Sequence, residues 1–124
     1  MSSEIMLSGQ IRVFLNHIYE YKKGVRNMVL MTLNQKYLQY AIQRLESQKI
    51  HFFVQELSNG RINLFFGKKV CLDVARKFAV KPFNRYTPEE DFILGTLLGY
   101  DVCIECERYC ELTEKQSEKQ KAIV

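Results

Sequence analysis

The sequence has 124 residues, 47% of them hydrophobic and 26% charged, with a net charge of +4 at pH 7. This length suits one domain, and the hydrophobic fraction excludes an intrinsically disordered chain. No apolar run approaches the roughly 20 residues that a membrane-spanning helix needs, so we expect no membrane contact. We expect one domain over residues 1–124, with frayed ends at 1–10 and 114–124.

Charge is distributed unevenly along the chain. Residues 61–85 contain seven Lys and Arg against one acid, whereas residues 86–124 contain four against nine acids. A basic middle and an acidic end predict mutual contact, either within the fold or between two copies.

Local patterns predict three elements in the first half of the chain. Apolar residues at helical spacing predict a helix over residues 11–23 that buries Phe14 and Ile18 and ends at Gly24. Residues 25–33 predict a strand that is apolar on both faces, which is typical of a strand covered on both sides. Asn34 is a good N-cap for a helix over residues 35–49.

The clearest local signal is Asn59-Gly60, a preferred pair for a tight hairpin turn, between predicted strands 52–57 and 61–66. With these two residues as the turn, Leu57 lies opposite Ile62. One face of the hairpin is then apolar and is expected in the core. The opposite face carries three apolar side chains that need cover from water: Phe52, Val54 and Phe65.

The second half of the chain is predicted to be helical. A helix over residues 68–78 has the following apolar stripe: Val70, Cys71, Val74, Ala75 and Phe78. The run from Thr87 to Glu90 supplies an N-cap, a proline at the first helical position and acids in the first turn, so a further helix begins there. The apolar pattern then either continues past Gly99 to about Thr113 or restarts at Asp101 as another helix.

This order of elements predicts an α+β fold with a small three-stranded sheet. A strand, a helix and a hairpin are most simply closed as a split β-α-β unit, in which the second hairpin strand lies between the other two. We expect about five helices, covering one face of the sheet.

The cysteines allow two interpretations. Residues 1–9 lack the basic and apolar regions of a signal peptide, which predicts a cytoplasmic protein whose four cysteines are thiols or metal ligands. Cys103, Cys106 and Cys110, completed by Cys71, are ligand types for zinc or an iron–sulfur cluster. Alternatively, a stripe of small residues at helical spacing allows a second helix to approach closely: Gly95, Gly99, Cys103, Cys106 and Cys110. Together with the uncovered hairpin face, this stripe predicts a dimer interface: Phe52, Val54, Phe65, Gly95, Gly99 and Cys103.

Other candidate residues are less specific. A small anion or a partner could bind at the end of the first helix, on Tyr19, Tyr21, Lys22, Lys23 and Arg26. The basic residues 61–85 could face nucleic acid, although a solvated helix face explains them equally well. His17 and Arg26 could meet Tyr86 and Asp91 in space, and His51 opens a strand, but no local motif specifies a reaction.

Two blocks of the sequence are distinctive: HIYEYKKGVRN at residues 17–27 and TPEEDFILGTLLGYD at residues 87–101. With CERY at residues 106–109, they resemble a small bacterial family of uncharacterised proteins, domain-of-unknown-function family 2023. The resemblance extends over about residues 11–112. It implies three strands, five helices and a homodimer, and it implies no catalytic residue.

The sequence therefore favours a small cytoplasmic homodimer that acts as an accessory or regulatory interaction module, without catalysis and without a cofactor. An unidentified protein partner is compatible with this prediction. Two alternatives stay open: a metal-binding or redox-linked protein that uses the cysteines, and a nucleic-acid-binding module that uses the basic surface of residues 61–85.

Overall fold

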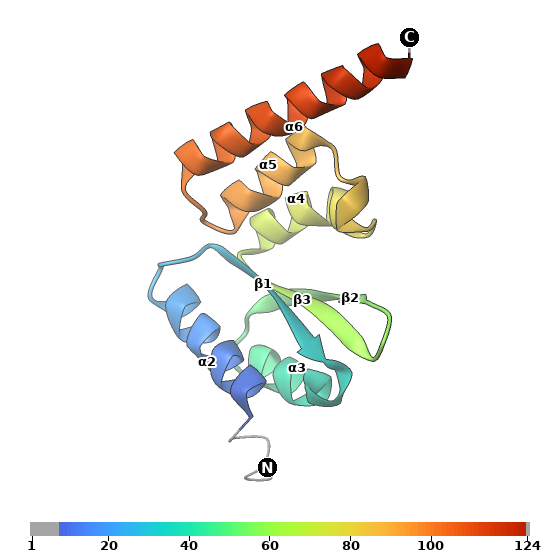
Figure 1. The fold of residues 1–124 in the computed structure, drawn as a ribbon. Helices are drawn as coiled ribbons and strands as arrows, with labels where there is room; N and C mark the ends of the chain where they lie inside the picture. The colour runs from blue at the N-terminus through green and yellow to red at the C-terminus, as the bar shows by residue number, and fades with distance from the viewer. Residues whose placement is uncertain (1–7, 124) are drawn as a thin grey trace.

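A three-stranded sheet separates two layers of helices in the computed structural model, which describes residues 8–123 (Figure 1). Helices α2 and α3 lie on one side of the sheet, and α4, α5 and α6 lie on the other. The elements, in chain order, are α2 (Gly9–Lys22), β1 (Met28–Asn34), η1 (Gln35–Tyr37), α3 (Leu38–Ser47), β2 (His51–Glu56), β3 (Arg61–Gly67), α4 (Lys69–Ala79), η2 (Phe83–Arg85), α5 (Pro88–Leu97) and α6 (Val102–Ile123). None of these helices is long and apolar enough to cross a membrane.

The strand order is β1-β3-β2, and both pairings are antiparallel. The predicted α+β class and the central position of the second hairpin strand are therefore confirmed. A polar ladder crosses the sheet at Asn63, which is buried. The Thr32 hydroxyl donates to Asn63 Oδ1 at 2.7 Å, and Asn63 Nδ2 donates to Gln55 Oε1 at 3.2 Å. These bonds satisfy the amide that would otherwise be costly to bury.

The predicted hairpin register is wrong by one residue. Phe53 lies opposite Phe65, and Val54 lies opposite Leu64. The turn takes in Ser58 as well, because the Leu57 N–H donates to the Arg61 carbonyl at 2.9 Å and closes a three-residue loop. Side chains alternate along a strand, so a slip of one residue exchanges the two faces of β2.

Both faces of the sheet are covered by this chain, so the prediction of helices on one face is wrong. Phe52, Val54 and Phe66 pack on the α2–α3 side. Phe65 lies on the opposite side, where it is 0% exposed and packs in one cluster with Leu72 and Phe78 of α4. The three side chains that were expected to lack cover therefore pack against helices of this chain, on opposite faces of the sheet.

The α4 helix turns a different stripe inward from the one predicted. Its buried residues are Leu72, Ala75, Phe78 and Ala79. Val70, predicted to be buried, is 69% exposed, and Val74 is exposed as well. Two of the predicted positions therefore face solvent, and Leu72 packs instead in the cluster that contains Phe65.

Helix ends follow the predicted capping residues. Gly24, with φ +80, ends α2, and its N–H donates to the Tyr21 carbonyl at 3.0 Å. At α5, Thr87 and Glu90 form a complete capping box.

The C-terminal segment forms two helices, which settles the alternative that the sequence left open. Gly99 adopts φ +83 between them, and α6 restarts where the Asp101 carboxylate accepts the Ile104 N–H at 3.1 Å. α6 then continues to Ile123, past the end expected near Thr113. At the other terminus, residues 9 and 10 belong to α2, and residues 1–7 of the expected frayed end lie outside the described residues.

Candidate functional site

An ion pair and a close contact help to hold helix α6 against α5. Arg108 binds Asp91 with two hydrogen bonds, from Nε to Oδ2 at 2.7 Å and from a terminal nitrogen to Oδ1 at 3.1 Å. The Asp91 carboxylate raises the pKa of the Arg108 guanidinium. Near the start of α6, the Glu105 side chain rests on Gly95, where a Cβ would collide with a carboxylate oxygen. Glycine at this position thus lets the two helices approach closely.

An apolar groove opens on the outer surface between these helices, with a volume of about 390 Å³. Its lining residues are Glu89, Phe92, Ile93, Cys106, Tyr109 and Cys110. The rings of Phe92 and Tyr109 meet edge to face, with their centroids 6.0 Å apart. The Tyr109 hydroxyl lies 3.4 Å from Glu89 Oε1, and the Glu89 charge raises the pKa of that phenol. Ile93 is 37% exposed, so apolar surface in this groove is open to solvent.

One flank of α6 carries small uncharged side chains, and two of them line this groove. We call it the cysteine flank, and it consists of Cys103, Cys106, Cys110, Thr113 and Ser117. Successive members are three or four residues apart, which is the spacing of a helix seam that contacts another helix. All three cysteines are exposed.

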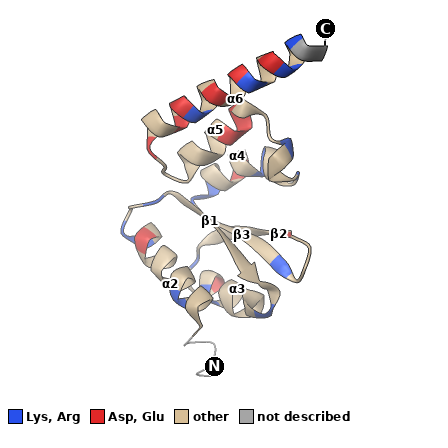
Figure 2. Ribbon diagram, viewed as in Figure 1, with Lys and Arg blue, Asp and Glu red and all other residues tan. Residues whose placement is uncertain are grey.

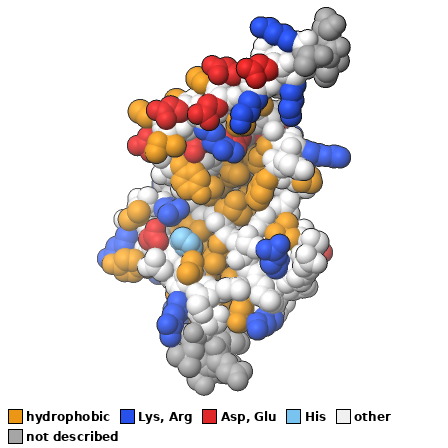
Figure 3. All heavy atoms as spheres, viewed as in Figure 1, with side chains coloured by type: hydrophobic (Ala, Val, Ile, Leu, Met, Phe, Trp, Pro, Cys, Tyr) orange, Lys and Arg blue, Asp and Glu red, His pale blue; other side chains and the backbone are white. Residues whose placement is uncertain are grey.

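The charge of α6 changes sign along its length. Residues 101–114 contain five acids and one arginine, whereas residues 115–121 contain three lysines and one glutamate. The ribbon in Figure 2 is coloured for acidic residues along the helix and for basic residues in its last turns. In the space-filling view of Figure 3, Asp and Glu side chains gather over α6, above a hollow lined with hydrophobic side chains.

The four cysteines do not form one cluster. Cys71 lies on α4 and packs against the core cluster on that side of the sheet, while the other three lie on α6. At 1.5 Å per residue, Cys103 and Cys110 lie about 10 Å apart along the helix axis. Among the described residues, no three His, Cys, Asp or Glu side chains are placed to hold one metal ion.

The six predicted interface residues fall into three environments. Phe65 and Gly95 are buried within the chain, and Phe52 and Val54 are half-buried against the α2–α3 core. Gly99 and Cys103 are exposed. The premise that Phe65 needs a second copy to cover it is therefore wrong. The continuous stripe from Gly95 to Cys110 is interrupted because the chain turns at Gly99.

The residues of the predicted anion site at the end of α2 have partners within the fold. Tyr21 packs against the ring of Phe66, and Lys22 Nζ donates to Gln48 Oε1 at 2.8 Å. Lys23 Nζ lies 5.5 Å from the ring centroid of Tyr19. Anion or partner binding at this end of α2 stays a prediction.

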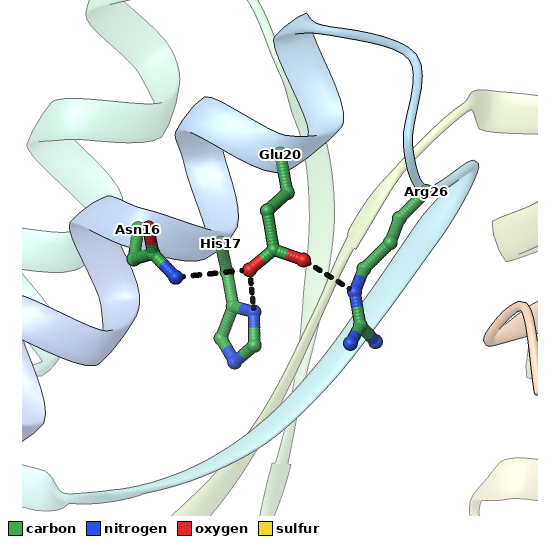
Figure 4. A network of polar contacts seen from close by, with 4 residues as sticks. All are labelled: Asn16, His17, Glu20 and Arg26. Carbon is green, nitrogen blue, oxygen red and sulfur yellow. Dashed lines mark hydrogen bonds and ion pairs between the residues drawn. The ribbon is translucent and has the colours of Figure 1, made fainter.

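The fifth residue of that set, Arg26, belongs to a network centred on Glu20, which the sequence analysis missed (Figure 4). Arg26 Nε donates to Glu20 Oε2 at 2.9 Å, and Asn16 Nδ2 donates to Oε1 at 3.0 Å. His17 Nδ1 lies 3.5 Å from the same Oε1. The hydrogen bond from Arg26 lowers the pKa of the Glu20 carboxyl. The helical spacing of Asn16, His17 and Glu20 could have predicted part of this network.

The residues considered for catalysis belong to separate networks. Asp91 is bound by Arg108, and Arg26 is bound by Glu20. Tyr86 lies in the η2–α5 connection, where burial, with a smaller contribution from the Glu90 charge, raises the pKa of its phenol to about 12. The second histidine, His51, is exposed at the start of β2.

Several basic side chains of residues 61–85 have partners within the fold. Lys69 Nζ lies 3.0 Å from Asp73 Oδ2, and Lys81 binds Glu90. The Arg76 guanidinium lies over the ring of Phe53, 4.9 Å from its centroid. Nucleic-acid binding by this surface stays a prediction.

Comparison with protein families gives one result that decides membership. A family described as proteins of unknown function, DUF2023, matches residues 12–112. The chain belongs to the DUF2023 family. The DUF2023 match extends from α2 to Leu112 of α6, so the lysine-rich end of that helix lies beyond it. A search of curated proteins finds no match.

Proposed function

We propose that this DUF2023 protein is a homodimeric interaction module, with an accessory or regulatory role, that self-associates through the outer surface of α5 and α6. The exposed apolar groove between these two helices is the observation that carries the proposal. It leaves Ile93 and the neighbouring cysteines of α6 in contact with water. Burying that surface against an equivalent surface is favourable, and a two-fold contact is the commonest way to do so.

The charge of α6 favours a second copy as the occupant. A two-fold axis perpendicular to the helix places two α6 helices antiparallel. The acidic residues 101–114 of one copy then lie beside the lysine-rich residues 115–121 of the other, on both sides of the axis. The small side chains of the cysteine flank allow the two helix backbones to approach closely.

Sedimentation velocity of the full chain at micromolar concentration, under reducing conditions, tests this proposal. The expected species has twice the mass of the 14.7 kDa chain. Cys110→Glu places a charge in the groove and is expected to give a monomer. Ile104→Glu is the matched control, because Ile104 is 62% exposed on a different flank of α6 and the charge change is the same. Circular dichroism checks that both variants retain their helices.

Two results contradict the proposal. One is a wild-type protein that sediments at 14.7 kDa at every concentration. The other is a dimer that Cys110→Glu and Ile104→Glu affect equally, which would place the contact elsewhere. Raising the salt concentration is expected to weaken the dimer, because the antiparallel arrangement pairs solvent-exposed charges.

A further inference from the structure

A second pocket, separate from the outer groove, lies beneath the start of α6 on the sheet side of the helices. Its volume is about 440 Å³, which suits a small organic molecule. Leu30 of β1 and Leu94 and Leu98 of α5 supply apolar walls. In Figure 3, hydrophobic side chains gather in the hollow between α6 and the sheet.

Three aromatic residues line this pocket: Phe83, Tyr86 and Tyr100. The rings of Phe83 and Tyr86 are nearly perpendicular, with an interplanar angle of 87° and centroids 5.3 Å apart. The Tyr86 hydroxyl is buried and has no hydrogen-bond partner among the described residues. Aromatic faces attract cations.

The pocket also contains a buried carboxyl group that lacks a bonded partner. Glu105 is 6% exposed and lines the pocket where it rests on Gly95. Among the described residues, its side chain has no hydrogen bond and no ion pair within 4 Å. Arg108 attracts Glu105 electrostatically, but Asp91 already holds that guanidinium with two hydrogen bonds. Two carboxyl groups therefore share one guanidinium, which leaves one negative charge to be balanced. Because Glu105 lines the pocket, its carboxylate is open to a positively charged ligand group.

We infer that this pocket binds a small organic ammonium ion with an apolar body. The ammonium group supplies the missing partner of Glu105 and lies against the aromatic rings. The apolar body contacts the leucine walls. An anion is repelled by the net charge of the pocket, and a neutral ligand leaves Glu105 without a partner.

Isothermal titration of the full chain with phenethylammonium tests this inference. Phenethylammonium is expected to bind at least tenfold more tightly than 2-phenylethanol, which has a similar shape and no charge, and phenylacetate is expected not to bind. Glu105→Gln is expected to reduce phenethylammonium affinity at least tenfold. Glu107→Gln is the matched control, because it removes the same charge from an exposed position on α6 and should leave the affinity unchanged.

Equal affinity for phenethylammonium and 2-phenylethanol overturns the inference, as does an unchanged affinity in Glu105→Gln. Failure of phenethylammonium to bind overturns it as well. If Glu105→Gln does not fold, Tyr100→Leu provides the same test, because Tyr100 is exposed at the pocket edge and its ring is expected to contact the cation. The result is independent of dimer formation, which sedimentation measures separately.

Discussion

Truncation of Phe65 to alanine is expected to destabilise each chain strongly. The ring is completely buried between β3 and α4, and it stacks on Phe53 with a centroid distance of 4.4 Å and an interplanar angle of 10°. Removing a fully buried phenylalanine loses the transfer free energy of its ring and leaves a cavity, a combined cost of about 3–5 kcal/mol. The free energy of unfolding of a domain of this size is about 5–15 kcal/mol, so the substitution removes a substantial part of it.

Urea unfolding, followed by circular dichroism, measures this loss. With an m value of about 2 kcal/mol per molar urea, a loss of about 4 kcal/mol lowers the midpoint by about 2 M. Val70→Ala is the control, because it removes apolar atoms from an exposed position of α4 and is expected to change the stability by less than about 0.5 kcal/mol.

Two outcomes would refute the reasoning about Phe65. A loss below about 1 kcal/mol would place the ring on the surface rather than in the core. A difference from wild type that grows on tenfold dilution would mean that a second copy covers the ring. Cover from α4 predicts the same difference at both protein concentrations.

Three further changes have defined outcomes. Asn63→Ala removes the centre of the buried polar ladder and is expected to cost about 1–3 kcal/mol in urea unfolding, because its two neighbours lose their partner. Thr87→Ala removes the N-cap of α5 and is expected to cost about 0.5–2 kcal/mol, measured in the same way; an unchanged midpoint would show that the cap does not contribute. Tyr86→Phe is expected to flatten the alkaline loss of stability. The pKa of Tyr86 in the folded protein is about 12, above its ordinary value of 10.0, so folding favours the protonated phenol. The wild-type protein therefore has the stability that the protonated phenol supplies below pH 10, and it loses this stability as the pH rises to about 12. Thermal unfolding from pH 9 to 12 measures the difference, and identical curves would contradict the assignment.

Local signals in the sequence predicted the end of α2, the start of α5 and the strand order. Gly24, Asn34 and Thr87 act through hydrogen bonds to residues a few positions away, so their roles are visible in a short segment. The hairpin was also correctly located by Asn59-Gly60, and the strand order followed from the connections.

Local signals could not predict on which face of the sheet a side chain lies, or which distant segments contact each other. Including Ser58 in the turn exchanges the faces of β2, and the turn residues alone do not distinguish the two registers. The cover over Phe65 depends on where α4 packs, which a stripe of apolar residues does not specify. The contact of Gly95 with Glu105 joins two helices whose separation at Gly99 was itself undecided from the sequence.

The position of β3 has a consequence for synthesis of the chain on the ribosome. This strand is the last of the three to be made, yet it lies between the other two and supplies buried side chains to both cores. While a nascent chain ends before Arg61, β1 and β2 lack their common neighbour, and their backbone groups are open to other strands. The sheet therefore closes only after translation has passed Gly67.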